Sequence, residues 1–206
     1  MKVSIGSTVL LITSILVFCG FLQRVLDRMK LTDRQALLLI GLMLAGTFAP
    51  EIEIGQFSIN IGGCLIPGGI CIYLLISAES AYERLRSVIG AVIIGFSIYL
   101  LSKLLPSEPE MLQLDPLWLY AASGAILAWL IGRSRRAAFI CGVAGTLLAD
   151  LMSYIVSTLQ GFESELHLGG GGIVDTCVMT GVLSVLLCET VGELLERLTR
   201  ERRGET

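Results

Sequence analysis

Two aspartates, Asp150 and Asp175, stand inside apolar stretches that are long enough to lie in a membrane. A carboxylate at membrane depth is costly, and such residues usually face the interior of a helix bundle or a water-filled cavity. If the two side chains meet, repulsion between like charges makes the pair share a proton. Such a pair suits proton-coupled transport, and it equally suits aspartic-protease chemistry, in which one acid activates water and the other donates a proton. A third interpretation gives the acids no chemistry and lets them only tie helices together.

Other polar side chains accompany Asp150 on one face of its segment. At about 100° per residue in a helix, Thr146, Asp150, Ser153 and Ser157 share one stripe, which runs from the middle of the segment to its outer end. A stripe of this kind is typical of a helix that lines a cavity. It is equally typical of hydrogen bonding between helices without any cavity.

The segment SINIGGCLIPGGI carries a third group of unusual residues, namely Asn60, Pro67 and two glycine pairs at 62–63 and 68–69. Proline and glycine pairs kink or break a membrane helix. A broken helix exposes backbone carbonyls, from which ion and substrate sites are often built. Close packing of helices on the glycines is the alternative.

These groups, together with the threonine that follows Asp175, define one expected site for a substrate or ion. Its members are Asn60, Pro67, Thr146, Asp150, Ser153, Asp175 and Thr176. In the protease interpretation, Asp150 and Asp175 are the catalytic pair. The expected occupants are H⁺, a small cation or a membrane-embedded substrate.

Composition sets the class of protein. The chain has 206 residues, of which 54% are hydrophobic and 16% are charged, whereas soluble domains carry about a quarter charged residues. The net charge of −3 argues against a nucleic-acid partner.

All six cysteines lie in apolar runs, where they act as small buried residues. His167 is the only histidine, with Glu163 and Glu165 nearby, and one histidine does not make a metal site. We therefore expect no metal and no cofactor.

The apolar runs predict an all-α polytopic membrane protein with about seven transmembrane helices. The predicted spans are residues 4–22, 36–50, 57–77, 87–105, 116–132, 137–159 and 171–192. Residues 1–196 then form one transmembrane domain, and 197–206 form a short basic tail with some helical extension.

Basic residues gather in alternate connections between these spans, whereas the intervening connections carry acids. The basic residues concerned are Arg24, Arg28, Lys30, Arg34, Arg84, Arg86, Arg133, Arg135, Arg136, Arg197, Arg200, Arg202 and Arg203. Cytoplasmic connections carry the excess of Lys and Arg, so the N-terminus is expected outside and the C-terminus in the cytoplasm. We expect a multi-pass protein of the cell (plasma) membrane.

Three sequence blocks resemble the uncharacterised prokaryotic membrane family known as domain of unknown function 1614. The blocks are FSINIGGCLIPGGICIYLLI, AGTLLADLMSYI and GGGGIVDTCVMTGVLSVLL, and the resemblance covers roughly residues 36–190. It implies a multi-spanning fold and selects the same polar residues, but it brings no known activity. The chain departs from the family pattern at Val174–Thr176, where an aromatic residue, Asp and Gly are expected.

A fainter resemblance is to presenilin-like intramembrane aspartyl proteases, which place two catalytic aspartates on adjacent helices. Here Gly172 and Asp175 keep only part of the motif on the second helix, and no Pro-Ala-Leu follows. Three functions therefore stay open. They are a small transporter or ion-translocating protein, an intramembrane aspartyl protease, and a non-catalytic membrane assembly factor.

Overall fold

The computed structural model describes part of the chain, and for 196–203 only the backbone. The described residues are 42, 50–78, 80–105, 116–161, 165–169 and 176–203. The span predicted at 4–22 lies outside them, as does most of the span predicted at 36–50.

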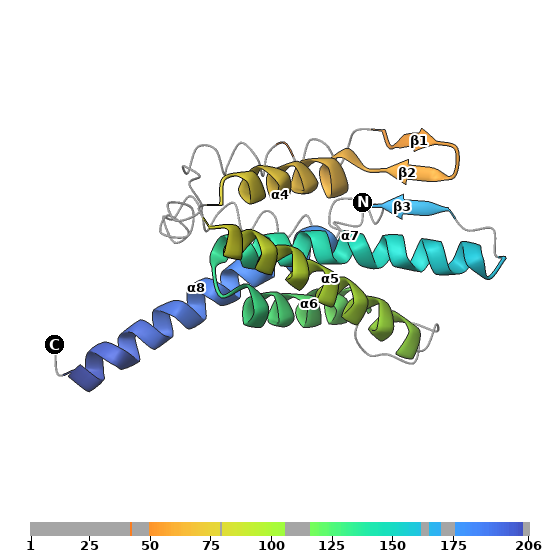
Figure 1. Cartoon of the computed structure of the whole chain (residues 1–206). Helices are drawn as coiled ribbons and strands as arrows, with labels where there is room; N and C mark the ends of the chain where they lie inside the picture. The colour runs from red at the N-terminus through yellow and green to blue at the C-terminus, as the bar shows by residue number, and fades with distance from the viewer. Residues whose placement is uncertain are drawn as a thin grey trace, which may run out of the picture.

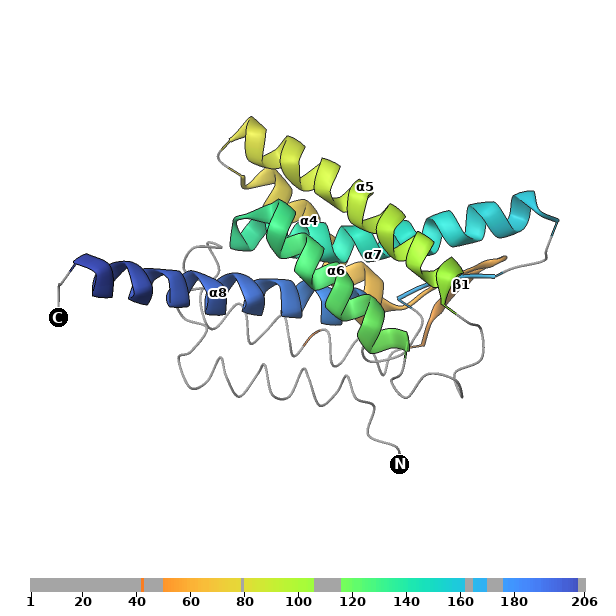
Figure 2. The same cartoon turned by 90° about the horizontal axis from the view of Figure 1, so that it is seen from below.

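The described residues are mostly helical, and one helix lies at the centre of the others (Figure 1). The helices of the bundle are α5 (Ala81–Leu104), α6 (Pro116–Gly132), α7 (Arg135–Leu159) and α8 (Thr176–Arg203). Helix α7 packs against α5, α6 and α8, and also against the shorter α4 (Ile66–Ile76). The C-terminal part of α8 projects beyond the bundle (Figure 2).

Within the described residues, three helices are long and apolar enough to cross a membrane. They are α5, α7 and the Thr176–Leu195 part of α8, whereas Ile61–Ile76 and α6 are shorter apolar helices. These helices correspond to the last five of the seven predicted spans. The agreement is closest for α6, which begins and ends where the sequence predicted, and α8 continues as a helix to Arg203.

Serine residues set where two of the long helices begin. The Ser80 hydroxyl accepts the N–H of Tyr82 at 3.2 Å at the start of α5, and the Ser134 hydroxyl accepts the N–H of Ala137 at 3.1 Å at the start of α7. Both serines have extended backbones and act as N-caps, which satisfy N–H groups that lack a partner within the helix.

The prediction of an all-helical chain missed a small three-stranded sheet at one end of the bundle (Figure 1). Strands β1 (Ile52–Ile54) and β2 (Phe57–Ile59) form an antiparallel hairpin, whose turn contains Gly55 with φ of 65°. Strand β3 (Leu166–Leu168) follows α7 in the chain and pairs with β2 in parallel. The sheet thus joins the segment before α4 to the segment between α7 and α8, which are far apart in the sequence. The first three residues of the span predicted at 57–77 form strand β2 rather than helix.

Where the sequence predicted a break in this span, the structure has a change from π-helix to α-helix. One turn of π-helix, η1 (Ile61–Leu65), leads directly into α4, and Pro67 lies in the first turn of α4. A proline is tolerated there because the N–H groups of the first turn have no partner within the helix. The backbone is therefore hydrogen-bonded across the junction, rather than unwound as expected.

Small residues allow the helices to approach closely. A β-carbon on Gly95 would lie 2.9 Å from the carbonyl oxygen of Gly145, and one on Gly145 would lie 2.7 Å from Cγ2 of Ile94. Lipid chains are as apolar as leucine, so contacts of this kind, together with interhelical hydrogen bonds, hold membrane helices together.

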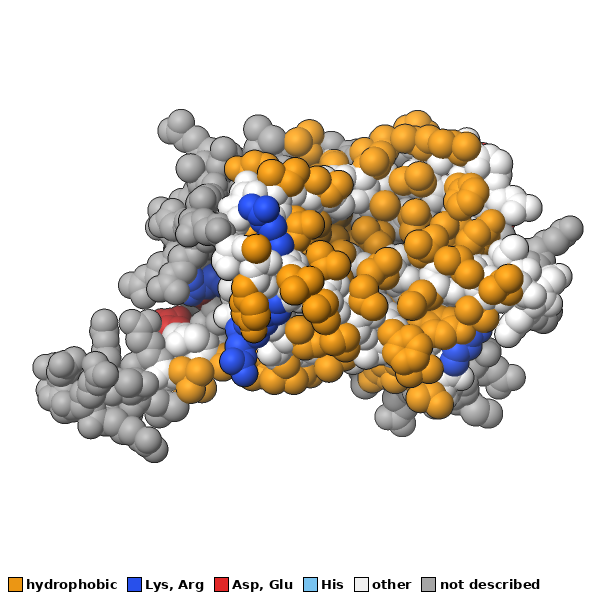
Figure 3. All heavy atoms as spheres, viewed as in Figure 1, with side chains coloured by type: hydrophobic (Ala, Val, Ile, Leu, Met, Phe, Trp, Pro, Cys, Tyr) orange, Lys and Arg blue, Asp and Glu red, His pale blue; other side chains and the backbone are white. Residues whose placement is uncertain are grey.

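The described arginines are concentrated at the end of the bundle opposite the sheet. Basic side chains gather around the α4–α5 and α6–α7 connections, and the face between the two ends is largely hydrophobic (Figure 3). The described arginines at this end are Arg84, Arg86, Arg133, Arg135 and Arg136. We call it the basic end and the opposite one the sheet end.

Candidate functional site

The polar stripe expected on α7 lies between the buried core and the surface. Thr146 is buried, with 2% of its surface exposed, whereas Asp150, Ser153 and Ser157 are half-buried. At 1.5 Å per residue, Asp150 is about 22 Å along the axis from Arg135 and about 14 Å from Leu159. An ionisable group therefore lies well inside the central helix, far from both ends.

The hydroxyl of Thr146 is engaged within its own helix. It donates to the carbonyl oxygens of Gly142, at 3.1 Å, and Val143, at 2.9 Å. This arrangement is common for Thr in apolar helices, because it satisfies the hydroxyl without a partner on another helix. As a ligand, Thr146 could offer its oxygen lone pairs but not its proton.

Asn60 is placed by the sheet and shapes the start of the helix that follows. Its N–H donates to the carbonyl of Leu168 at 3.0 Å, and its side-chain Oδ1 accepts the N–H of Gly63 at 3.0 Å. The residue is 3% exposed. Asn60 is thus the N-cap of η1, a role that sequence analysis did not assign to it.

Replacing Asn60 with alanine should lower the stability of the protein by about 1 kcal/mol, because the N–H of Gly63 loses its acceptor. Asn60→Asp keeps an acceptor oxygen and should retain most of the stability. Thermal unfolding of both variants in detergent measures the effect. Equal unfolding temperatures for Asn60→Ala and the wild type would contradict the capping role.

Contacts between α7 and α8 fix the register of these antiparallel helices. The Ser184 hydroxyl donates to the carbonyl of Ala138 at 3.1 Å, and a β-carbon on Gly142 would lie 3.1 Å from the carbonyl oxygen of Thr180. The helices are antiparallel, so four residues forward along α7 from Gly142 and four residues back along α8 from Thr180 bring Thr146 opposite Thr176. The structure therefore brings these two predicted site residues to one level of the bundle.

Of the other members of the expected site, Pro67 is buried in α4, where the neighbouring Ile66 and Ile70 pack against Val178 and Met179 of α8. Asn60 is buried at the sheet. Asp175 is outside the described residues, so its distance from Asp150 stays a prediction.

Two cavities lined by described residues stand out, and neither of them is lined by a residue of the expected site. One of about 430 Å³ lies between α4, α5 and α7 and is walled by apolar side chains such as Ile72, Val92 and Leu147. The other, of about 820 Å³, lies at the basic end and is lined by Arg133, Arg135 and Arg136.

Sequence analysis missed this second cavity, because it assigned the arginines only to membrane topology. A signal was present in the sequence: RSRR places three guanidinium groups around Ser134, the residue that caps α7.

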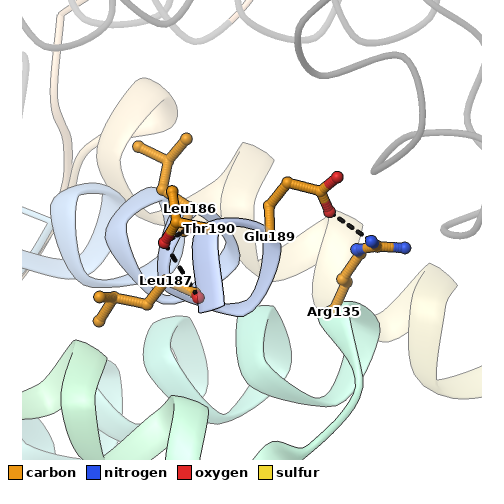
Figure 4. A network of polar contacts seen from close by, with 5 residues as sticks. All are labelled: Arg135, Leu186, Leu187, Glu189 and Thr190. Carbon is orange, nitrogen blue, oxygen red and sulfur yellow. Dashed lines mark hydrogen bonds and ion pairs between the residues drawn. The ribbon is translucent and has the colours of Figure 1, made fainter. Parts of the chain in front are cut away.

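An ion pair joins the same end of α7 to α8. Arg135 pairs with Glu189, and their side chains are 17% and 6% exposed (Figure 4). By contrast, His167 and Glu165 form an exposed pair at the sheet end, with 3.4 Å between Nε2 and Oε2. The five described cysteines are free thiols, and Cys71, Cys141 and Cys177 are buried, as expected for small apolar residues.

Comparison with known proteins places the chain in a family. The family described as "Protein of unknown function (DUF1614)" matches residues 18–187. Sugar transport protein 8 of Arabidopsis thaliana is 24% identical over 157 residues, which are 76% of this chain and 26% of that protein, so the chain spans about a quarter of this curated relative. No solved structure matches. The presenilin-like similarity finds no support in these matches. The chain therefore belongs to the DUF1614 family of proteins of unknown function.

Proposed function

We propose that this protein is a small multi-pass transporter or ion-translocating protein of the plasma membrane, in which Asp150 binds H⁺ or a small cation. The observation that carries the proposal is the place of this carboxyl group. It is half-buried, well inside the central helix of the bundle. Because an acid at this depth is costly, its presence favours a function over a purely structural role.

The polar stripe supports access to Asp150 from the sheet end. Ser153 and Ser157 follow it at intervals of about one turn and are half-buried. Between these serines in the sequence, the Tyr154 hydroxyl is 3.3 Å from Oε1 of Gln56, to which it donates. Half-buried hydroxyl groups at this spacing suit a path for water or protons along α7.

Toward the basic end, α7 and α8 are in close contact and leave no comparable path on this face. The Ser184 hydroxyl donates to the carbonyl of Ala138, and a β-carbon on Gly142 would be in tight contact with the carbonyl oxygen of Thr180, at 3.1 Å. The arrangement therefore favours a site that is reached from the sheet end and closed toward the basic end. Transport would require α7 and α8 to shift relative to each other, as rigid elements do in alternating access.

The proposal retains Asp175 and Thr176 as further groups of the site. Thr176 lies at the level of Thr146 in the register described above, and Asp175 precedes it directly in the sequence. The relative from Arabidopsis thaliana, a sugar transport protein, supports transport as the class of function. It makes D-glucose a reasonable first solute to test.

Substituting Asp150 with asparagine should reduce proton flux about tenfold or more, because an amide cannot take up and release a proton. The protein is reconstituted in vesicles that contain the pH dye pyranine, and valinomycin with a potassium gradient drives proton entry. Flux is measured with and without D-glucose. Glu165→Gln removes an exposed acid, 75% of whose side chain is accessible, and should keep the wild-type rate.

The outcomes separate the alternatives. Flux that requires D-glucose and Asp150 indicates proton-coupled solute transport, whereas flux that requires Asp150 alone indicates a proton pathway. If Asp150→Asn conducts like the wild type, the proposal is wrong. An unchanged rate combined with a lower unfolding temperature would instead assign Asp150 to helix association.

A further inference from the structure

The cavity at the basic end has the shape and charge of a binding site. It has a volume of about 820 Å³, is open on one side, and lies between the start of α5, the α6–α7 connection and α8. Its walls combine charged residues, among them Arg133, Arg135 and Arg136, with apolar ones such as Trp129, Leu130 and Leu195.

The positive charges in this cavity exceed the negative ones. Of the lining residues, three are arginines and one is an acid, Glu83, whose Oε1 accepts the hydroxyl of Ser134 at 2.7 Å. Arg135 pairs with Glu189, but its buried Nη1 has no hydrogen-bond partner among the described residues. Nε of Arg136 is also buried and has no such partner within the same part of the chain. Buried donors of this kind are rare unless a ligand or water satisfies them.

The start of α7 adds to the attraction for an anion. Arg135 and Arg136 occupy the first turn, where the helix dipole is positive and basic side chains are disfavoured. The first N–H groups of a helix lack acceptors within it, and they form a natural site for a phosphate group. A bound anion would offset the repulsion between the helix end and the arginines.

We propose that this cavity binds a phosphate group, either in the headgroup of an anionic lipid or as a free phosphate. Planar guanidinium groups match phosphate oxygens in pairs. The apolar walls formed by Trp129, Leu130 and Leu195 would accept the glycerol and the first carbons of a lipid. Basic pockets on the cytoplasmic side of membrane helices bind such headgroups.

Membrane topology alone does not account for these features. The positive-inside rule requires basic residues near the membrane surface, where their side chains can reach water. It does not require Arg135 and Arg136 to bury donor atoms beside a cavity. The inference is independent of Asp150, because that residue lies about 22 Å along α7 from Arg135.

Fluorescence of Trp129 can test the proposal in the full-length protein. The chain has two tryptophans, and Trp118→Phe leaves only the one that lines the cavity. The purified variant in a neutral detergent is titrated with dihexanoyl phosphatidic acid, with sodium phosphate, and with dihexanoyl phosphatidylcholine as a lipid without net charge. We expect a saturable change with phosphatidic acid or phosphate, and a much weaker one with phosphatidylcholine.

Matched arginine variants make the result specific. Replacing Arg133 and Arg136 together with glutamine should weaken binding by at least about tenfold, since two charges near the ligand are lost. Arg86→Gln removes one charge at the same end outside the cavity wall and should leave binding nearly unchanged. Tighter binding of phosphatidic acid identifies a lipid site, and equal or tighter binding of phosphate identifies a free-anion site. No saturable change, or equal weakening in Arg86→Gln and the double variant, would overturn the proposal.

Discussion

A Gly145→Leu variant should unfold about 6–12 °C below the wild type, which corresponds to a loss of about 3 kcal/mol. Gly145 faces α5 at a point where a β-carbon would lie 2.7 Å from Cγ2 and 2.9 Å from Cβ of Ile94. It would also lie 3.2 Å from the carbonyl oxygen of Ala91, which belongs to the backbone and cannot rotate away. The helices must therefore move apart, and the contact between α5 and α7 along their length is weakened.

The matched control for this substitution is Gly69→Leu on α4. Gly69 is exposed, and a β-carbon there meets no atom within 4 Å. Because leucine is a better helix former than glycine, this change should leave the unfolding temperature unchanged or raise it slightly. Thermal unfolding in detergent, followed by tryptophan fluorescence, compares the two. If Gly145→Leu and Gly69→Leu unfold at the same temperature, close packing of α5 on α7 is not what stabilises the bundle.

Glu189→Leu should also be strongly destabilising, by about 3–5 kcal/mol, because it leaves the guanidinium of Arg135 without its counter-charge. The two side chains are 17% and 6% exposed, so both charges are largely removed from bulk water. Replacing Arg135 and Glu189 together with leucine removes both charges and should cost less than Glu189→Leu alone. If the pair contributes through its charges, the double variant is more stable than Glu189→Leu. If only packing were lost, the double variant would be at least as unstable as Glu189→Leu.

The exposed pair at the sheet end provides the comparison. Glu165→Leu removes the carboxylate beside His167, but both side chains are largely exposed. Pairs of this kind contribute about 1 kcal/mol or less, so the variant should unfold close to the wild type. A Glu189→Leu variant as stable as Glu165→Leu would show that the Arg135–Glu189 pair does not hold α7 against α8.

Within the described part of the chain, the sequence predicted the helices well and their ends less evenly. Helix α6 has the predicted bounds, whereas α5 begins at Ala81 rather than at residue 87. Ser80 and Ser134 cap α5 and α7 in the structure, a role that sequence analysis did not assign to either residue. The segment around Pro67 was less well predicted, because a proline in the first turn of a helix and one that breaks a helix look alike in sequence. The strand Phe57–Ile59 was missed, since its parallel partner, Leu166–Leu168, comes after α7. A strand of three residues has too little pattern of its own to be recognised without that partner.

Among the candidate residues, the sequence identified Asp150, because an acid inside a long apolar run is conspicuous whatever surrounds it. It assigned a ligand role to Asn60, which in the structure caps η1 through the N–H of Gly63. The arginines of the α6–α7 connection were visible in the sequence, but their place around a cavity was not.

By itself, the sequence determined which segments are apolar helices, where charge lies along the chain, and the family to which the chain belongs. These properties depend on the local run of residues, since the transfer of a side chain from water to lipid is a property of that side chain and its neighbours in the chain. Only the tertiary structure decided that Gly145 meets Ile94, that Arg135 meets Glu189, and that three arginines surround one cavity. Those contacts join segments that are distant in the sequence, and close packing of whole helices, rather than local preference, brings them together.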